Sequence, residues 1–300
     1  MADSRNQAYA QQLDALTRQA EELSAEGRRR VLELLRHVHA QVLADIAQTP
    51  GGSYSAARLQ MLKAQVDRNL ENFGAKASAD VAVLEAKTYR QIAVQIDTTV
   101  AAGTGGVLVQ PVIDRAALQV VQGYTADLIS GLSRDASAKI NAAIQRGYLG
   151  GTDLQQTVEA IGRALDDGKF SGLFSQIGER AMTIATNEIG RVNSLASISR
   201  IQALKEHHPG LGKRWLHIPV ARVPRISHLI ADGQVRKPDE PFLVEGEELM
   251  YPRDPSGSAE NTINCHCLVQ PYLSEDQLKP TDQERQLLKS YGLSIETRAA

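Results

Sequence analysis

The sequence is poor in the residues on which several classes of protein depend. Only 2 of its 300 residues are cysteine, which excludes the dense disulfide framework of small secreted domains. Aromatic residues make up 4% of the chain, which argues against a β-sandwich. The apolar content comes instead from residues such as alanine, leucine and valine, and this balance favours helices that pack through small side chains.

The chain also lacks an excess of charge of either sign. Its formal net charge is −2 and its pI is about 6.4, whereas proteins that hold duplex DNA by its phosphates usually carry a basic excess. We therefore expect no tight non-specific DNA binding by the whole chain. No apolar run reaches the roughly 18 residues of a membrane span, and the first residues do not resemble a secretory signal. We expect no membrane contact, and synthesis in a reducing cytoplasm.

Common catalytic and nucleotide-binding motifs are missing. The sequence contains no Walker loop, no GxGxxG, no HExxH and no GxSxG. The glycine-rich stretch AAGTGGVLV at 101–109 lacks the lysine of a phosphate-binding loop, so we interpret it as a hinge.

The first half of the chain has the periodicity of long helices. One apolar stripe recurs at steps of three and four, through Leu16, Ala20, Leu23, Gly27, Val31, Leu34, Val38 and Val42. It predicts a helix from about residue 8 to 47, about 60 Å long, that ends at Pro50-Gly51-Gly52. Such a helix either joins a bundle core or docks on a partner chain. Further helices are expected at 59–73 and 81–100, at 114–149 after an Asp114 cap, at 152–165 after a Thr152 cap, and at 177–206.

The character of the sequence changes at residue 211, where proline and glycine become frequent. Short β-forming stretches follow, separated by turn signals: KRWLHIPVARV, PFLVEGEEL and NCHCLVQPYL. A last helix is expected in TDQERQLLKSYGL. The sequence thus predicts an α+β protein with a helical region at 1–170, a small helix-plus-β-hairpin domain at 171–275 and a C-terminal helical tail at 276–300.

The two cysteines stand one residue apart, at Cys265 and Cys267. In a strand they would point to the same face, with Cα atoms about 6.6 Å apart, and their thiolates could converge on one structural zinc ion. His228 is the expected third ligand, and the fourth would be His217, His266 or Asp232. The alternative is a pair of small buried thiols in a tight turn, with His228 bonded to the backbone.

Two other groups of polar residues are candidate sites. Glu188, with Asn187 and Asn193 on the 177–206 helix, is either an acid or base, or a set of polar anchors for the β-region; Arg191 shares its helix face.

The second group is basic. It is either a phosphate contact for nucleic acid or a set of partners for the acidic stretches at 239–240 and 245–248. Its members are Arg214, Trp215, His217, Arg222, Arg225 and His228.

Residues from about 178 to 272 carry an ordered set of motifs: a helix RAMTIATNEIGRVNSLA, a tryptophan strand, an Arg-x-x-His turn, an Asp-Gly turn, a phenylalanine, and a closing Asn-Cys-x-Cys. In this order they resemble the phage Mu protein F-like, or phage head morphogenesis, family of minor head proteins. The resemblance covers about a third of the chain, and His266 stands where the family usually has arginine. Its residues here are Arg180, Ala181, Thr186, Glu188, Asn193, Ala196, Trp215, Arg225, His228, Asp232, Gly233, Phe242, Asn264, Cys265 and Cys267.

The resemblance implies a non-enzymatic minor structural protein of a tailed-phage head. Such a protein is expected in the capsid interior near the portal vertex, bound to the portal protein or the major capsid protein, and it would assist head assembly and DNA packaging or ejection. Self-association through the N-terminal helices and weak contact with packaged DNA are further expectations. The rival interpretation is an enzyme carried in the virion, either a metal-dependent nuclease or an ADP-ribosyltransferase-like domain around Glu188 and the Cys/His residues.

Overall fold

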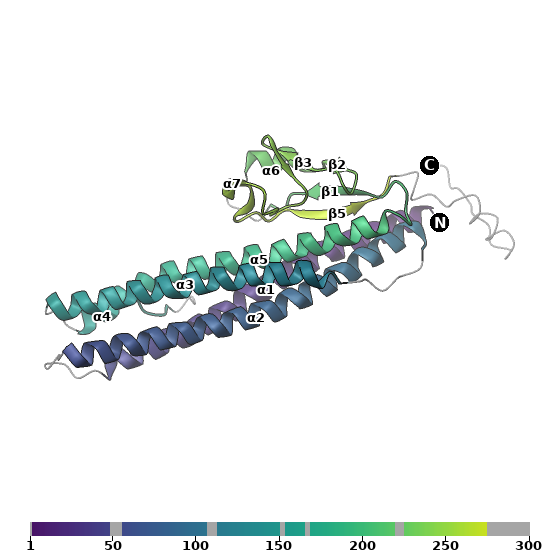
Figure 1. Ribbon diagram of the computed structural model, residues 1–300. Helices are drawn as coiled ribbons and strands as arrows, with labels where there is room; N and C mark the ends of the chain where they lie inside the picture. Colours follow the sequence, from purple (N-terminus) through teal and green to yellow (C-terminus); the bar gives the residue numbers. More distant parts are fainter. Residues whose placement is uncertain are drawn as a thin grey trace. The chain divides into compact units, whose positions relative to one another are not determined.

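A computed structural model describes residues 2–48, 56–106, 113–150, 154–165, 169–219 and 225–274. Several expected features lie outside these ranges: the Pro50-Gly51-Gly52 stop, the Thr152 cap, Arg222 and the C-terminal helical tail. Figure 1 shows the elements in chain order, with long helices first and a small sheet afterwards. The α+β fold class is confirmed. No helix in the described part of the chain is long and apolar enough to cross a membrane.

The helices are mostly those that the sequence predicts. They are α1 (Ala2–Ala47), α2 (Ala56–Thr104), α3 (Arg115–Gly150), α4 (Leu154–Ile161) and α5 (Gly172–Leu204). The Asp114 cap is confirmed, because its carboxylate accepts a hydrogen bond from the Ala117 N–H at 2.9 Å. The predicted break at Gly74 is wrong, since α2 continues through it. A Cβ at Gly74 would lie 3.0 Å from Ser133 Oγ, so this glycine allows α3 to approach closely.

The apolar stripe of α1 is covered by the protein itself. Val31, Val38 and Val42 are buried, and a Cβ at Gly27 would lie 3.2 Å from Ile189 and 3.4 Å from Leu84. The stripe therefore belongs to a helical core, and the argument that it needs a partner chain to cover it is wrong. One position was also misassigned: Leu35 is fully buried, whereas Leu34 is only partly covered.

Contacts between Cα atoms divide the chain into two compact units. Unit 1 consists of Met1–Leu23, Ala86–Leu118 and Gly190–Ala300, and unit 2 of Ser24–Glu85 and Gln119–Ile189. The four long helices, α1, α2, α3 and α5, each contribute residues to both units. The boundary between the units therefore falls within helices. The division expected at residues 170 and 275 rests on sequence composition and stays a prediction.

Unit 2 is helical in its described part. Antiparallel segments of α2 and α3 are joined by polar contacts at both ends: Gln122 Nε2 donates to the Ala82 carbonyl at 2.9 Å, and the Ser133 hydroxyl donates to the Leu70 carbonyl. His39 from α1 is buried against Phe170 and Phe174, and its Nε2 lies 3.0 Å from the Gly162 carbonyl oxygen.

Unit 1 contains the sheets. An antiparallel sheet has the order β2-β1-β5, from β1 (Gly212–Leu216), β2 (Val235–Arg236) and β5 (Leu268–Tyr272), with Trp215 opposite Val269. A hairpin pairs β3 (Phe242–Val244) with β4 (Glu247–Leu249) through a turn at Glu245 and Gly246, both with positive φ. Short helices α6 (Ile226–Ala231) and α7 (Ala259–Thr262) connect the strands.

Two side chains of α1 form hydrogen bonds with β5 and with the residue that follows it. The Tyr9 hydroxyl donates to the Pro271 carbonyl at 2.7 Å and accepts from the Leu273 N–H at 3.2 Å. Gln270 Nε2 donates to the Thr17 hydroxyl at 3.1 Å. Residues more than 250 positions apart in the chain are thus packed together in unit 1.

Candidate metal centre

The two cysteines and His228 form one buried cluster in unit 1. Their ligand atoms all lie within 4.8 Å of one another, and the side chains are 1% (Cys265), 1% (Cys267) and 3% (His228) exposed. Among the residues that the structure describes, this is the only group of three or more His, Cys, Asp or Glu side chains that converge closely enough to hold a metal ion.

The cysteines do not lie in a strand, contrary to the sequence expectation. β5 begins at Leu268, directly after Cys267, and both cysteines belong to the connection from α7. Asn264 has a φ of 54°, a left-handed conformation that asparagine tolerates better than most residues, and it turns the chain just before Cys265. The turn therefore sets the direction in which the segment with both thiols leaves α7, and this segment lies outside the strand.

His228 reaches the cysteines from the short helix α6. Arg225 precedes this helix, and its guanidinium donates to the Ile263 carbonyl at 2.6 Å. This bond ties the start of α6 to the connection that carries the cysteines. After the helix, Gly233 has a φ of 76°, and its N–H donates to the Trp215 carbonyl at 3.0 Å, so the Asp-Gly turn returns the chain to β1.

His217 lies beside the cluster, outside the converging group of three. Its Nδ1 atom lies 3.6 Å from Cys267 Sγ, while Nδ1 of His228 lies 3.4 Å from the same sulfur. The backbone N–H of His217 donates to the Asp232 carboxylate at 2.8 Å, which fixes the residue where β1 ends. None of the three residues considered for a fourth ligand, His217, His266 and Asp232, belongs to the converging group. His217 is next to the Cys267 sulfur, and Asp232 positions His217.

These distances match a tetrahedral zinc site. With Zn–S bonds of about 2.3 Å and Zn–N bonds of about 2.0 Å at the tetrahedral angle, a ligand sulfur and a ligand nitrogen lie about 3.5 Å apart. The two Sγ to Nδ1 distances at Cys267 are 3.4 and 3.6 Å. Each imidazole nitrogen that faces this sulfur is also a ligand that zinc accepts.

The electrostatics of the thiols favour a cation. The hydrogen bond from Cys267 is the main reason that the pKa of Cys265 lies well below its ordinary value, and His228 and Arg253 lower it further against the effect of burial. The pKa of Cys267 is raised, chiefly by its hydrogen bond to Cys265 and by burial. The buried guanidinium of Arg253 supplies positive charge beside the pair.

Aromatic and basic side chains close the site. Trp215 is fully buried, with its ring centroid 5.9 Å from His228 and 5.4 Å from Phe242 in edge-on geometry. Arg253 is also buried, and it donates to the Cys267 carbonyl at 3.1 Å. Gly190 makes room for it, because a Cβ there would lie 2.3 Å from the Arg253 Cζ atom. Sequence reasoning missed Arg253 and Gly190, which carry no local signal of this contact.

The other two candidate groups from the sequence are the polar residues of α5 and the basic group. Glu188 is 2% exposed and belongs to unit 2, whereas Asn193 is 3% exposed and belongs to unit 1. Of the basic group, Arg214 donates to the Gln270 side chain at 3.2 Å and Arg225 to a carbonyl. The expected pairing of these arginines with the acidic stretches is wrong.

Those acids have lysine partners instead: Asp239 pairs with Lys205 at 2.6 Å, and Glu240 with Lys237 at 3.2 Å.

Comparison with known proteins gives one similar chain. The uncharacterized protein YqbB of Bacillus subtilis (strain 168) is 33% identical over 114 residues, which is 36% of this chain and 35% of YqbB. The chain therefore matches about a third of the length of that relative. No protein-family model matches the sequence, and no solved structure matches it.

Proposed function

We propose that this chain is a non-enzymatic minor structural protein of a tailed-bacteriophage head, of the Mu F-like head morphogenesis type. It would be present in the capsid interior near the portal, where it assists head assembly and DNA packaging or ejection. The ordered motifs from the 177–206 helix to Cys267 carry the resemblance. The YqbB match shows that a related sequence exists in Bacillus subtilis, and its name specifies no function.

One observation supports the proposal best. The motif residues from Asn193 onward form the interior and the turns of a single compact unit. Trp215, His228 and both cysteines are buried, and Gly233 forms a turn with positive φ. A set of residues that fixes a fold, with its reactive atoms enclosed, fits a protein whose role is to be positioned.

We also propose that unit 1 is held together by one structural zinc ion on Cys265, Cys267, His228 and His217. When bound, the ion would supply cross-links between chain segments that are far apart in the sequence. Four protein ligands complete a closed tetrahedral site, as in structural zinc sites, and leave no position for a substrate. In small domains such a site contributes directly to folding.

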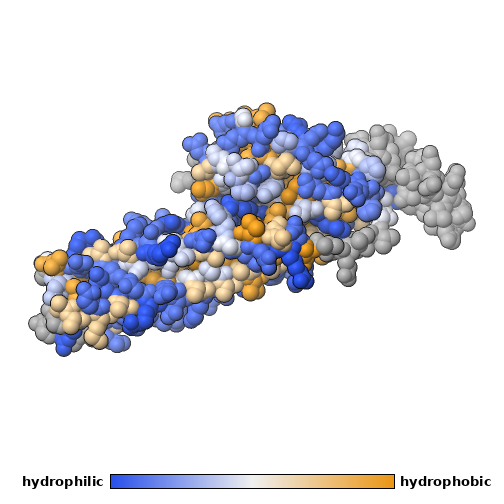
Figure 2. Space-filling view, in the orientation of Figure 1, coloured by the Kyte–Doolittle hydropathy of each residue, from blue (hydrophilic) through white to orange (hydrophobic). Residues whose placement is uncertain are grey.

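Docking on the portal or the capsid wall would use outward-facing side chains, because the α1 stripe is already covered. In unit 1, α6 exposes Ile226 at 73%, Leu229 at 46% and Ile230 at 75%. On the face that Figure 2 shows, apolar residues are otherwise scattered among hydrophilic ones.

The test of the proposed function is the location of the chain in purified particles. A phage that carries a tagged copy of the gene would be propagated, and its virions purified, analysed by mass spectrometry and reconstructed without imposed symmetry. The proposal predicts a few copies per particle next to the portal. Absence of the chain from virions, together with normal heads when the gene is deleted, would contradict it.

The enzyme alternative has a separate test. Purified protein would be incubated with DNA, and in a second series with a dinucleotide donor and host extract. The non-enzyme proposal predicts no turnover in either series. Turnover that is abolished by Glu188→Gln would refute it.

A further inference from the structure

Unit 1 exposes apolar side chains on two neighbouring elements, α6 and β3. Ile226, Leu229 and Ile230 are exposed on α6. Leu243 of β3 is 54% exposed, while the residues on either side of it are buried. Successive residues of a strand point to opposite faces, so the side chain of Leu243 points away from the core. The Cα atoms of α6 and β3 approach within 8 Å, and the two elements lie side by side (Figure 1).

Both elements pack on the ring of Trp215. The ring centroid of His228 on α6 lies 5.9 Å from that of Trp215, and the ring centroid of Phe242 on β3 lies 5.4 Å from it. Because the two neighbours bury their inner faces on one side chain, their outer faces adjoin. They form one apolar surface, the α6–β3 surface, whose members are Ile226, Leu229, Ile230 and Leu243.

The side chain of Gln234 fixes the backbone of Leu243. The Leu243 N–H donates to Oε1 of Gln234 at 3.0 Å, and the Leu243 carbonyl accepts from Nε2 of Gln234 at 2.8 Å. These two bonds satisfy the backbone of Leu243 while its side chain stays exposed. An apolar side chain on a fixed backbone loses little conformational freedom when a partner covers it, which favours binding.

Carboxylates lie at the edge of this surface. The segment 225–249 has six acidic and three basic residues. Glu248 is directly opposite Leu243 in the β3–β4 pair, so the two side chains share a face. Glu245 is in the turn of the hairpin, and Asp232 follows α6. All three acids are exposed and form no ion pair within the part of the chain that the structure describes.

This charge restricts which partner can cover the apolar residues. The carboxylates repel the phosphates of DNA and of an anionic lipid surface. A second copy that docked about a two-fold axis would bring the same carboxylates together at the rim, which is unfavourable. A polypeptide with apolar side chains between lysines or arginines would bury the apolar residues and place its cations opposite the carboxylates.

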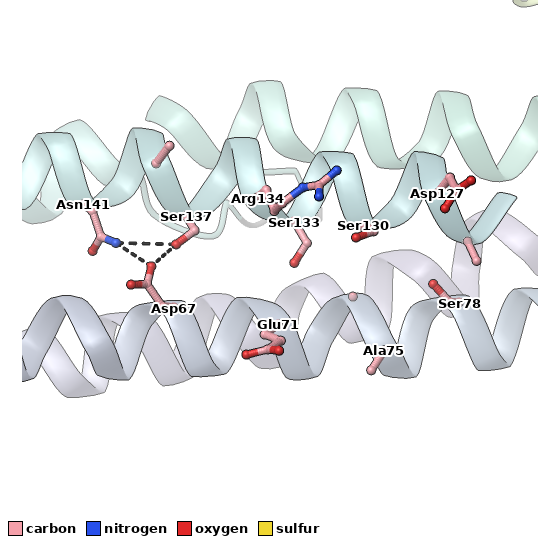
Figure 3. Close-up of a pocket in the computed structure, with 13 residues that line it drawn as sticks. Asp67, Glu71, Ala75, Ser78, Asp127, Ser130, Ser133, Arg134, Ser137 and Asn141 are labelled. Atoms are coloured by element: carbon pink, nitrogen blue, oxygen red, sulfur yellow. Dashed lines mark hydrogen bonds between the residues drawn. The ribbon is translucent and has the colours of Figure 1, made fainter. Parts of the chain in front are cut away.

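The groove between α2 and α3 in unit 2 has a different chemistry. Figure 3 shows the side chains that line it, with Asp67 and Glu71 on α2 and Ser137 and Asn141 on α3. Asp67 already accepts hydrogen bonds from Ser137 and Asn141. No apolar side chain larger than alanine lines this groove, so it lacks the anchors on which protein interfaces depend. The α6–β3 surface supplies such anchors.

We propose that the α6–β3 surface docks a basic amphipathic segment of another protein. The apolar side chains of that segment cover the isoleucines and leucines of the surface, and its lysines or arginines face Asp232, Glu245 and Glu248. The chemistry of the partner follows from the surface, and only its identification with the portal or the capsid wall rests on the proposed function. Four apolar side chains make a small contact, so we expect an affinity in the micromolar range.

The test uses fluorescence anisotropy on the full chain with three probes. The first is a short helical peptide of leucine and lysine, with the leucines on one face. The second is the same peptide with glutamate in place of lysine, and the third is a DNA duplex. Sedimentation velocity over a range of protein concentrations measures self-association.

Two pairs of variants locate the binding. Ile226→Ser/Ile230→Ser removes the two most exposed anchors, and its matched control is Met61→Ser/Leu149→Ser, two apolar residues of unit 2 that are 71% and 74% exposed. Circular dichroism and urea denaturation verify that each variant is folded.

The second pair tests the charges. Glu245→Gln/Glu248→Gln removes two carboxylates of the rim, and its matched control Glu33→Gln/Glu71→Gln removes two exposed carboxylates of unit 2. The measurements are made at low ionic strength, where exposed charges are least screened.

We expect saturable binding of the lysine peptide, and no comparable binding of the glutamate peptide or of DNA. The isoleucine variant weakens binding about tenfold or more, the rim variant about threefold, and both controls stay within about twofold of wild type. Equal binding of the two peptides, or equal weakening in a variant and its control, would overturn the proposal. So would a dimer or a DNA complex that Ile226→Ser/Ile230→Ser abolishes. Because the assay uses purified protein and synthetic probes, its failure would leave the location of the chain in particles, and hence the proposed function, unaffected.

Discussion

Replacement of Arg200 by methionine tests the packing of α2 against α5 in unit 1. Arg200 is 8% exposed and Asp97 is 5% exposed, and the Arg200 guanidinium donates to the Asp97 carboxylate. The pKa of Asp97 is raised because burial outweighs the effect of Arg200, so the carboxylate depends on its partner to stay charged. Loss of one partner of a buried ion pair costs about 3–5 kcal/mol, because a charge stays buried without compensation.

The cost of Arg200→Met should depend on pH in a defined direction. With its partner gone, the folded-state pKa of Asp97 lies still higher than its unfolded value, so the folded state binds more protons. The free energy of unfolding therefore falls as pH rises above about 4, until the folded-state pKa is passed. The double variant Asp97→Leu/Arg200→Met should regain most of the loss, since apolar residues of similar volume replace the pair.

The assay is urea denaturation of the full chain at pH 5 and pH 8, followed by circular dichroism. At pH 8 the single variant should lose about 3–5 kcal/mol of unfolding free energy, or about 8 °C in Tm for a chain of this size. A single variant within about 1 kcal/mol of wild type at pH 8, or a double variant as unstable as the single one, would refute the reasoning.

Three other substitutions have defined outcomes in urea denaturation, the first when it is carried out at pH 8 and at pH 9.5. Burial lowers the pKa of the fully buried Lys213 from 10.5 to about 8, so the unfolded state binds the extra proton and wild-type stability gains about 1.5 kcal/mol from this residue between pH 8 and 9.5. Lys213→Met should remove that gain, and an unchanged pH slope would contradict it. Gly190→Ala should lower the free energy of unfolding by about 2 kcal/mol, because the new Cβ displaces Arg253 from its bond to the Cys267 carbonyl. An unchanged stability would mean that Arg253 does not pack closely against residue 190. Val38→Asp should lower the free energy of unfolding by about 3 kcal/mol or more, because Val38 is buried in the helical core and the new carboxylate would lack a partner there. Leu34→Asp should cost clearly less, because Leu34 is only partly covered. Equal losses for the two variants would contradict this difference in burial.

The sequence predicts the helices well because their signals are local. Asp114 caps α3 through its own side chain, and the spacing of valines on α1 marks one face of a helix wherever that face packs. The identity of the segments that cover this face cannot be read from the nearby sequence. The sequence left open whether a bundle core or a partner chain covers the stripe, and segments of α2 and α5 that are distant in sequence cover it. Gly74 shows the same limit, since its role depends on Ser133 of another helix.

The metal centre was predictable in its residues and not in its geometry. Cys265, Cys267 and His228 stand out in a chain with few cysteines, and they do come together, with His217 beside Cys267. The strand that was expected to align the thiols is replaced by a turn at Asn264, which no periodicity reveals. Arg253 and Gly190 could be identified only from the close approach of α5.

The central claim is that Cys265, Cys267, His228 and His217 hold one zinc ion that stabilises unit 1. X-ray absorption spectroscopy at the zinc edge, on full-length protein purified without added metal, tests it most directly. The account predicts one zinc per chain with two sulfur ligands at about 2.3 Å and two nitrogen ligands at about 2.0 Å. A folded protein of unchanged stability that contains no metal, or a zinc ion without sulfur ligands, would contradict it.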